Sequence, residues 1–170
     1  VLEETCFYPE GGGQTSDVGS IYSEKCKLDV VDVQKMNNTI YHQCKLVSGT
    51  LNVGDKVSSA FSENHRKRVA SNHSSTHLLH HYLRLTLGDH VQQRGSSVTE
   101  DGFRFDFTHA KPVTEKELIL IENSIQDEIH ASINTKKNIL PFDKAIESGA
   151  LAFFEEKYED NVRVVNIGKE

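Results

Sequence analysis

The feature that most constrains this chain is a helical run from Ser62 to Leu87 that carries several histidines. Six residues recur at steps of three or four and therefore line one face of a helix. These six residues are Val69, His73, Thr76, His80, Leu83 and Leu87. His73 and His77 are four positions apart, so their side chains lie one helical turn apart. Two imidazoles at this spacing are half of a tetrahedral zinc site, although such a pair is also typical of a polar helix face. A zinc protease is excluded, because Ser74 stands where the HExxH motif needs its glutamate.

The composition predicts a globular, cytoplasmic protein. Apolar residues make up 36% of the 170 residues and fall in periodic segments, which is unlike a disordered chain. No apolar run is long enough to span a bilayer and no signal-peptide pattern opens the chain, so we expect no membrane partner. The cysteines Cys6, Cys26 and Cys44 are odd in number and far apart, which indicates reduced thiols in a cytosol.

A local basic cluster interrupts the acidic composition of the chain. The net charge is −6, whereas a general nucleic-acid binder is usually basic, so contact with nucleic acid would need a local patch. Arg66, Lys67 and Arg68 form that patch at the start of the histidine helix, where positive charge opposes the helix dipole. Contact with phosphate groups is the functional interpretation of the cluster, and a solvated helix start is the alternative.

Residues 1–61 are predicted to form a small β-barrel. The loop Gly11, Gly12 and Gly13 permits positive φ angles and close approach of a ligand or another backbone, but it also suits a plain turn. It is not a P-loop, because no GK[ST] follows. Several short strands joined by close turns are typical of a barrel. The predicted strands are Leu2–Tyr8, Gly19–Tyr22, Leu28–Val33, Thr39–Cys44 and Lys56–Phe61.

Residues 62–170 are predicted to form an α+β core with two long helices and a β-sheet. After the histidine helix, two strands surround a turn at residues 100–102, and the second buries three phenylalanines on one face. Thr114 and Glu117 then form a capping box that begins the second long helix. The predicted elements are strands Val91–Val98 and Phe103–Phe107, a helix with the apolar stripe Leu118, Ile121, Ile125 and Ile129, an extended segment Asn138–Phe142, a short helix Asp143–Ser148 and a strand Val162–Ile167.

Five stretches together resemble the editing domain of bacterial-type alanyl-tRNA synthetases. They occur in the family's order and span almost the whole chain. They read FYPEGGGQTSDVG from Phe7, NHSSTHLLH from Asn72, LGDHVQQRGS from Leu87, RFDF from Arg104 and GALAFFEEKYEDNVRVV from Gly149. The resemblance implies a translation-factor-like barrel followed by an editing core. It also implies hydrolysis of seryl-tRNA(Ala) and glycyl-tRNA(Ala), with the acceptor end of tRNA(Ala) and the remaining domains of the ATP-dependent ligase as partners.

The resemblance also assigns roles to particular residues. His73 and His77 match the family's HxxxH zinc pair, and Gln93, Gly95 and Ser96 match its QxGS segment at the editing pocket. The family's two further zinc ligands lie in a CxxxH motif that this sequence does not contain. We therefore expect a chain that stops before that motif, whose zinc content after purification is well below one ion per chain. His80, His81 and His109 are alternative ligands.

Two other interpretations stay open at this stage. The chain resembles free-standing trans-editing deacylases of the same superfamily, or it serves as a non-catalytic module that binds tRNA or a neighbouring domain. A ligase sequence encoded upstream of Val1 would exclude the free-standing deacylase. A deacylation assay on the chain separates an enzyme from a binding module.

Overall fold

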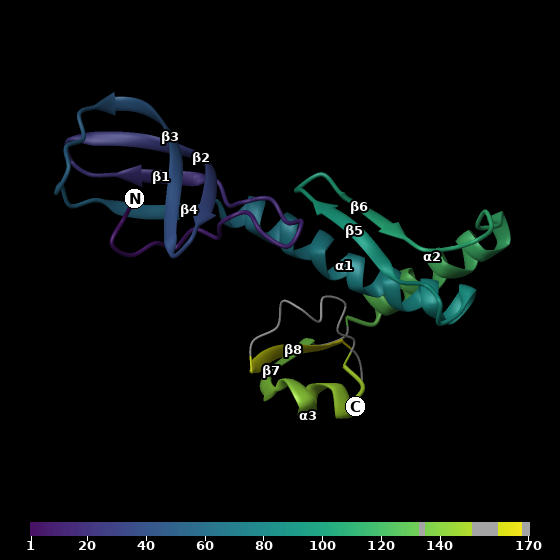
Figure 1. The fold of residues 1–170 in the computed structure, drawn as a ribbon. Helices are drawn as coiled ribbons and strands as arrows, with labels where there is room; N and C mark the ends of the chain where they lie inside the picture. Colours follow the sequence, from purple (N-terminus) through teal and green to yellow (C-terminus); the bar gives the residue numbers. More distant parts are fainter. Residues whose placement is uncertain (133–134, 151–159, 168–170) are drawn as a thin grey trace. The chain divides into compact units, whose positions relative to one another are not determined.

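The computed structural model describes residues 1–132, 135–150 and 160–167 (Figure 1). The described elements are strands, most of them in antiparallel pairs, and three helices. In chain order they are β1 (Gly19–Tyr22), β2 (Cys26–Met36), β3 (Thr39–Gly49), β4 (Ser58–Phe61), α1 (Glu63–Leu87), β5 (Gln93–Val98), β6 (Phe103–Phe107), α2 (Glu115–His130), β7 (Thr135–Pro141), α3 (Phe142–Glu147) and β8 (Asn161–Ile167).

The chain divides into two compact units. The first contains Val1–Leu78 and Arg94–Phe107, and the second contains Leu79–Gln93 and Thr108–Glu170. Helix α1 and strand β5 therefore contribute residues to both units. The division predicted between residues 61 and 62 stays a prediction.

The first unit contains a four-stranded sheet in the order β3-β2-β1-β4. Each neighbouring pair is antiparallel. Short connections favour this arrangement for the consecutive pairs β1-β2 and β2-β3. Ile21 of β1 and Val30 and Val33 of β2 form a core with Phe7. The register of β2 shifts between Val30 and Asp32, so that two residues three positions apart are both buried. Strands β2 and β3 are longer than the predicted segments. Closure of this sheet into a barrel stays a prediction.

The predicted strand Leu2–Tyr8 is wrong, because the structure gives these residues no strand. Side chains accept the amide hydrogens that a neighbouring strand would otherwise bind. The Phe7 amide donates to Thr5 Oγ1 at 3.2 Å, and the Tyr8 amide donates to Asp17 Oδ2 at 2.6 Å. The ring of Phe7 is nevertheless buried in the core, so this segment is anchored by its side chain and not by sheet pairing.

Helix α1 confirms the predicted histidine helix. It ends before Gly88, whose φ of 114° suits the left-handed region that glycine adopts without strain. Four of the six residues on the predicted face are buried, and the other two are half-buried. The buried four are Val69, Thr76, His80 and Leu83. The period of the apolar and small residues therefore identifies the face that packs.

The β5-β6 pair confirms the predicted strands around the turn at residues 100–102, with β5 beginning at Gln93 instead of Val91. The prediction that all three phenylalanines of β6 are buried is wrong. Phe105 and Phe107 are half-buried with ring centroids 6.3 Å apart, whereas Phe103 is exposed. A two-stranded sheet has fewer neighbours to cover its face than a larger one has.

In the second unit, the capping box at Thr114 and Glu117 is confirmed at the start of α2. The predicted apolar stripe is only partly right, because Ile121 is buried while Leu118 and Ile129 are exposed. Strands β7 and β8 pair antiparallel and, with α3, confirm the elements expected near the chain's end. Residues 151–159 of the resemblance stretch from Gly149 lie outside the described residues. None of the helices in the described residues is long and apolar enough to cross a membrane.

Candidate functional site

The glycine-rich loop of the first unit runs beside the end of strand β5. Gln14 forms a parallel bridge with Val98. The Val98 amide donates to the Gly13 carbonyl at 2.8 Å, and the Thr15 amide donates to the Val98 carbonyl at 3.0 Å. Within the loop, Gly11 and Gln14 exchange two backbone hydrogen bonds of 3.1 and 3.0 Å. The loop is therefore fixed by backbone bonds on both of its sides.

Gly13 is the glycine of this loop that packing requires. A Cβ atom at Gly13 would lie 2.4 Å from the Ser96 carbonyl oxygen and 2.8 Å from Ser96 Oγ, and the φ of Gly13 is 80°. Gly12 also has a positive φ, of 60°, but a Cβ there would meet no atom within 4 Å. The structure thus brings two predicted site residues, Gly13 and Ser96, into contact, and it leaves space over the backbone of Gly12.

The predicted histidine pair lies on one face of α1, with stacked rings. The ring centroids of His73 and His77 are 5.4 Å apart and the ring planes differ by 18°. His77 is exposed and His73 is half-buried. Gln14 Oε1 lies 2.5 Å from His73 Nδ1, which joins the glycine loop to the histidine helix. Sequence reasoning did not assign Gln14 to the site, although its place directly after the glycine triplet was the available signal.

The histidine pair offers imidazole nitrogens, which are a donor type that zinc takes in proteins, but two such donors are fewer than a structural zinc site needs. Two imidazoles one turn apart supply two of the four ligands of a structural site. Across the described ranges, no group of three or more His, Cys, Asp or Glu residues is placed to hold a metal ion. The further ligands implied by the resemblance lie in a motif that this sequence lacks, so zinc binding stays a prediction.

The three alternative ligands have other environments. His80 is 3% exposed, and burial lowers its pKa below the ordinary value, which is typical of a core histidine. His81 packs edge-on against Tyr82, with ring centroids 5.1 Å apart. His109 Nδ1 lies 2.9 Å from His90 Nε2, and the two rings are stacked. Each contact is within the second unit.

Arg66, which we predicted to contact tRNA, is held within the first unit. Its guanidinium forms an ion pair with the buried carboxylate of Asp17. It also donates to the Cys6 carbonyl at 2.7 Å and lies over the Phe61 ring, 3.3 Å from the centroid. This geometry gives Arg66 a structural role that explains a positive charge at the start of a helix.

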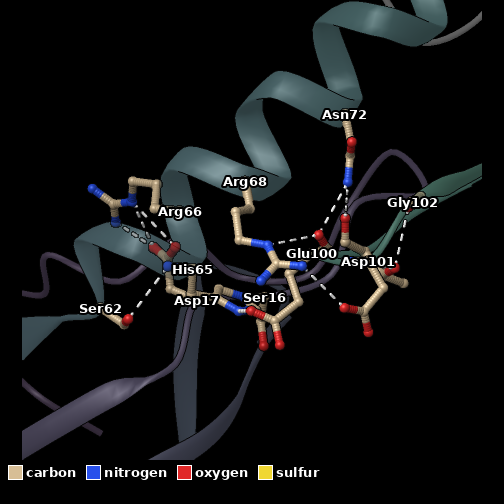
Figure 2. A network of polar contacts seen from close by, with 11 residues as sticks. Ser16, Asp17, Ser62, His65, Arg66, Arg68, Asn72, Glu100, Asp101 and Gly102 are labelled. Carbon is tan, nitrogen blue, oxygen red and sulfur yellow. Dashed lines mark hydrogen bonds and ion pairs between the residues drawn. The ribbon is translucent and has the colours of Figure 1, made fainter.

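Figure 2 shows how three residues of α1 hold the β5-β6 turn. Arg68 donates to the Glu100 carbonyl at 3.1 Å and to Asp101 Oδ1 at 3.2 Å. His65 Nδ1 lies 3.1 Å from Glu100 Oε2. Asn72 donates to the Thr99 carbonyl at 2.8 Å. These bonds fix the turn against the same helix that carries His73, whereas Lys67 is exposed.

The remaining predicted residues lie along β5. A Cβ at Gly95 would lie 3.0 Å from Asp106 Oδ2, so the absence of a side chain makes room for that carboxylate. Neighbouring residues of a strand point to opposite faces, so Ser96 faces away from this carboxylate and toward the glycine loop. Gln93 is the first residue of β5, is half-buried and belongs to the second unit.

Comparison with known proteins finds relatives of this sequence. Residues 1–65 match the family model described as tRNA synthetases class II (A). Over 168 residues the chain is 44% identical to an alanine–tRNA ligase of Leptospira biflexa. The matched region covers 99% of this chain and 18% of that ligase. The chain is related to alanine–tRNA ligases. Similar ligases occur in Carboxydothermus hydrogenoformans, 45% identical over 170 residues, and in Clostridioides difficile, 46% identical over 169 residues.

The relatives confirm the resemblance drawn from the sequence at the level of the ligase. The matches span 99% of this chain but only 20% and 19% of the Carboxydothermus and Clostridioides ligases. The chain therefore corresponds to about a fifth of each relative. The names of these alanine–tRNA ligases describe whole enzymes and do not say which step this segment serves.

Proposed function

We propose that this segment is the editing part of an alanine–tRNA ligase, which hydrolyses the ester of seryl-tRNA(Ala) and glycyl-tRNA(Ala). The observation that carries the proposal is the convergence of three predicted site segments in the first unit. The glycine loop packs on Ser96 through Gly13, and it meets the His73–His77 pair through Gln14. A plain turn between strands would have no need to reach both a helix and a separate hairpin.

An alanine-specific ligase has a physical need for such a second site. A pocket that accepts alanine rejects glycine poorly, because one methyl group is worth only about 1–3 kcal/mol. The added hydroxyl of serine is likewise a weak basis for exclusion from an apolar pocket. A second site with polar groups can bind that hydroxyl by hydrogen bonds and so separate serine from alanine.

The described residues suit the binding of an aminoacylated tRNA end. The space over the Gly12 backbone permits close approach of a sugar or phosphate, as side-chain-free backbone does elsewhere. Ser96 Oγ, which lies against Gly13, is the polar group of the first unit that we assign to recognition of the serine hydroxyl. The resemblance assigns Gln93 to the editing pocket, and a substitution of Gln93 tests that assignment. The ester is already activated, so the chain's task is to orient it against a water molecule. A zinc ion, which His73 and His77 would hold with further ligands, would supply a fixed positive charge at that place.

A second candidate function rests on a different observation. The class II synthetase family model matches residues 1–65 and ends within the first turn of α1. This match favours a role for strands β1 to β4 in support of the aminoacylation step, in which case changes in this segment would alter alanine charging. The two functions therefore predict different defects. Loss of editing would slow ester hydrolysis of mischarged tRNA, whereas loss of aminoacylation would slow alanine charging.

The test is Gln93→His in a complete ligase that carries this segment, with Gln92→His as the matched control. Gln92 is the exposed neighbour of Gln93. We expect Gln93→His to slow clearance of seryl-tRNA(Ala) by about 10-fold or more, the size of one lost hydrogen bond to substrate. Alanine charging should stay unchanged, and the control should behave as the parent. Undiminished clearance would remove Gln93 from the site, and loss of charging alone would favour the second candidate.

A further inference from the structure

The contact between Gln14 and His73 joins two segments that are 59 residues apart in the sequence. Gln14 Oε1 lies 2.5 Å from Nδ1 of the imidazole, and both side chains are half-buried. A carboxamide oxygen only accepts hydrogen bonds, so the ring nitrogen that faces it must be the one that carries the proton. In a neutral imidazole the other nitrogen then holds the lone pair.

We propose that Gln14 is a positioning residue that fixes His73 in the Nδ1–H tautomer and so presents the Nε2 lone pair on the helix face shared with His77. The inference rests on the proposed function, because it gives the histidine pair its role as ligands. Histidines that bind metals generally donate their second ring N–H to an oxygen, which sets the ring's orientation and tautomer. Gln14 supplies that oxygen from the glycine loop.

The loop is built to hold this oxygen in place. The backbone of Gln14 is bonded to Gly11 through both its N–H and its carbonyl, and it forms a parallel bridge with Val98. Gly13, the preceding residue, is fixed against Ser96, where no side chain would fit. With the backbone immobile, orienting the imidazole requires ordering of the Gln14 side chain alone. The close packing of the loop against β5 thus requires glycine at position 13 and also fixes the backbone from which Gln14 reaches His73.

The direct test reads the tautomer in the 170-residue chain by long-range ¹H–¹⁵N correlation of histidine-labelled protein at about pH 8, where an ordinary imidazole is neutral. We expect the Nδ1–H pattern for His73 in the parent. Gln14→Leu should shift His73 toward the Nε2–H tautomer, while Gln14→Glu, which keeps an acceptor oxygen, should retain the parent pattern. His42, which contacts Thr5 and not the loop, is the internal control for folding.

The parent spectrum alone can overturn the proposal, even if a variant fails to fold. An Nε2–H pattern for His73 in the parent would show that the Gln14 amide is turned the other way. An unchanged tautomer in a folded Gln14→Leu chain would show that Gln14 does not determine it. A chain that shows the expected tautomer shift but belongs to a ligase with no deacylase activity would refute the proposed function and leave only the control of the His73 tautomer by Gln14.

A second measurement tests the consequence for metal binding in the complete ligase. Zinc affinity, measured by competition with a chromophoric chelator, should fall by about 10- to 100-fold in Gln14→Leu. It should be retained in Gln14→Glu and in Gln126→Leu, a change at an exposed position of α2. Equal weakening in the Leu and Glu variants would overturn the positioning role, because it would show damage to the loop instead of loss of the acceptor.

Discussion

The two parts of helix α1 differ in the partners of their polar side chains. Glu63–Leu78 belong to the first unit, where Arg66, Arg68 and Asn72 bind loops that are distant in sequence. Leu79–Leu87 belong to the second unit, where buried side chains and a bond between Tyr82 and Glu128 hold the helix. Both parts bury side chains, among them Val69 in the first and Leu83 in the second. Polar bonds to loops distant in sequence distinguish the first part, whereas Arg84 in the second part bonds to nearby Asp89 and Val91.

Histidines in the two parts of the helix accordingly differ in burial and in contacts. His73 is half-buried and faces the carboxamide of Gln14, which suits a ligand that must be oriented. His80, seven residues further on, is buried, and its pKa is lowered by burial. Surroundings thus assign the role, since both residues lie on the face predicted from the same periodicity.

The largest expected effect comes from breaking the polar anchor of the first part of α1. Asp17 is 4% exposed and accepts hydrogen bonds from Arg66 and from the Tyr8 amide. Asp17→Ala should lower the free energy of unfolding by about 3 kcal/mol, because a charge pair with a buried member loses one partner. Urea-induced unfolding of the chain, followed by far-ultraviolet ellipticity, measures this loss.

The matched control for Asp17→Ala is Asp101→Ala, at the exposed partner of Arg68. The side chain of Asp101 is 85% exposed in its ion pair, so we expect a loss of less than about 1 kcal/mol. Similar losses in the two variants would break the distinction between a buried anchor and a surface ion pair within the first unit.

The next effect concerns the second part of α1. Tyr82 donates to Glu128 Oε1 at 2.7 Å, so Tyr82→Phe should lower the free energy of unfolding by about 1 kcal/mol. Burial, with the Glu128 hydrogen bond, raises the pKa of Tyr82 to about 12, so the donor keeps its proton and the loss should be equal at pH 7 and pH 9. Tyr41→Phe, at an exposed position of β3, should have no effect. A loss that disappears at pH 9 would contradict the raised pKa.

The pH dependence of stability sharpens the contrast between the histidines. Burial is the main cause that lowers the pKa of His80 from 6.5 in the folded chain, so below that pH the unfolded chain binds more protons. The stability that His80 contributes is therefore fully present above about pH 6.5 and is lost as the pH falls toward the folded-state pKa. His80→Gln should flatten this decline relative to the parent in urea titrations at pH 7.5 and 5.5. An unchanged slope in His80→Gln would assign the decline to other groups, including His42, whose pKa burial also lowers.

Sequence patterns predicted the elements whose causes are local. The face of α1 follows from a repeat of three and four residues, and the start of α2 follows from a capping box that spans four residues. The bond from Gln14 to His73 and the ion pair from Arg66 to Asp17 join residues 59 and 49 positions apart. A local sequence pattern cannot predict such distant partners. The sequence therefore indicated the histidine pair but not Gln14. For Arg66 it suggested contact with a phosphate group and did not indicate the ion pair with Asp17.

The smallest effect we expect is at Lys67, the exposed member of the basic cluster. Arg66 and Arg68 both bind carboxylates and carbonyls of the first unit, so Lys67 is the member of the cluster at which we expect contact with tRNA phosphate. One lost phosphate contact should reduce the slope of log affinity against log salt by about 0.7–0.9, which is less than a twofold change in affinity for each doubling of salt. The measurement is a salt titration of tRNA(Ala) binding by a complete ligase carrying Lys67→Ala, with Lys116→Ala, at an exposed position of α2, as the control. A slope equal to the parent's would leave Lys67 as a solvated residue at a helix start. A loss of unfolding free energy in Lys67→Ala comparable to that of Asp17→Ala would show instead that the whole cluster, and not Arg66 alone, anchors this part of the helix.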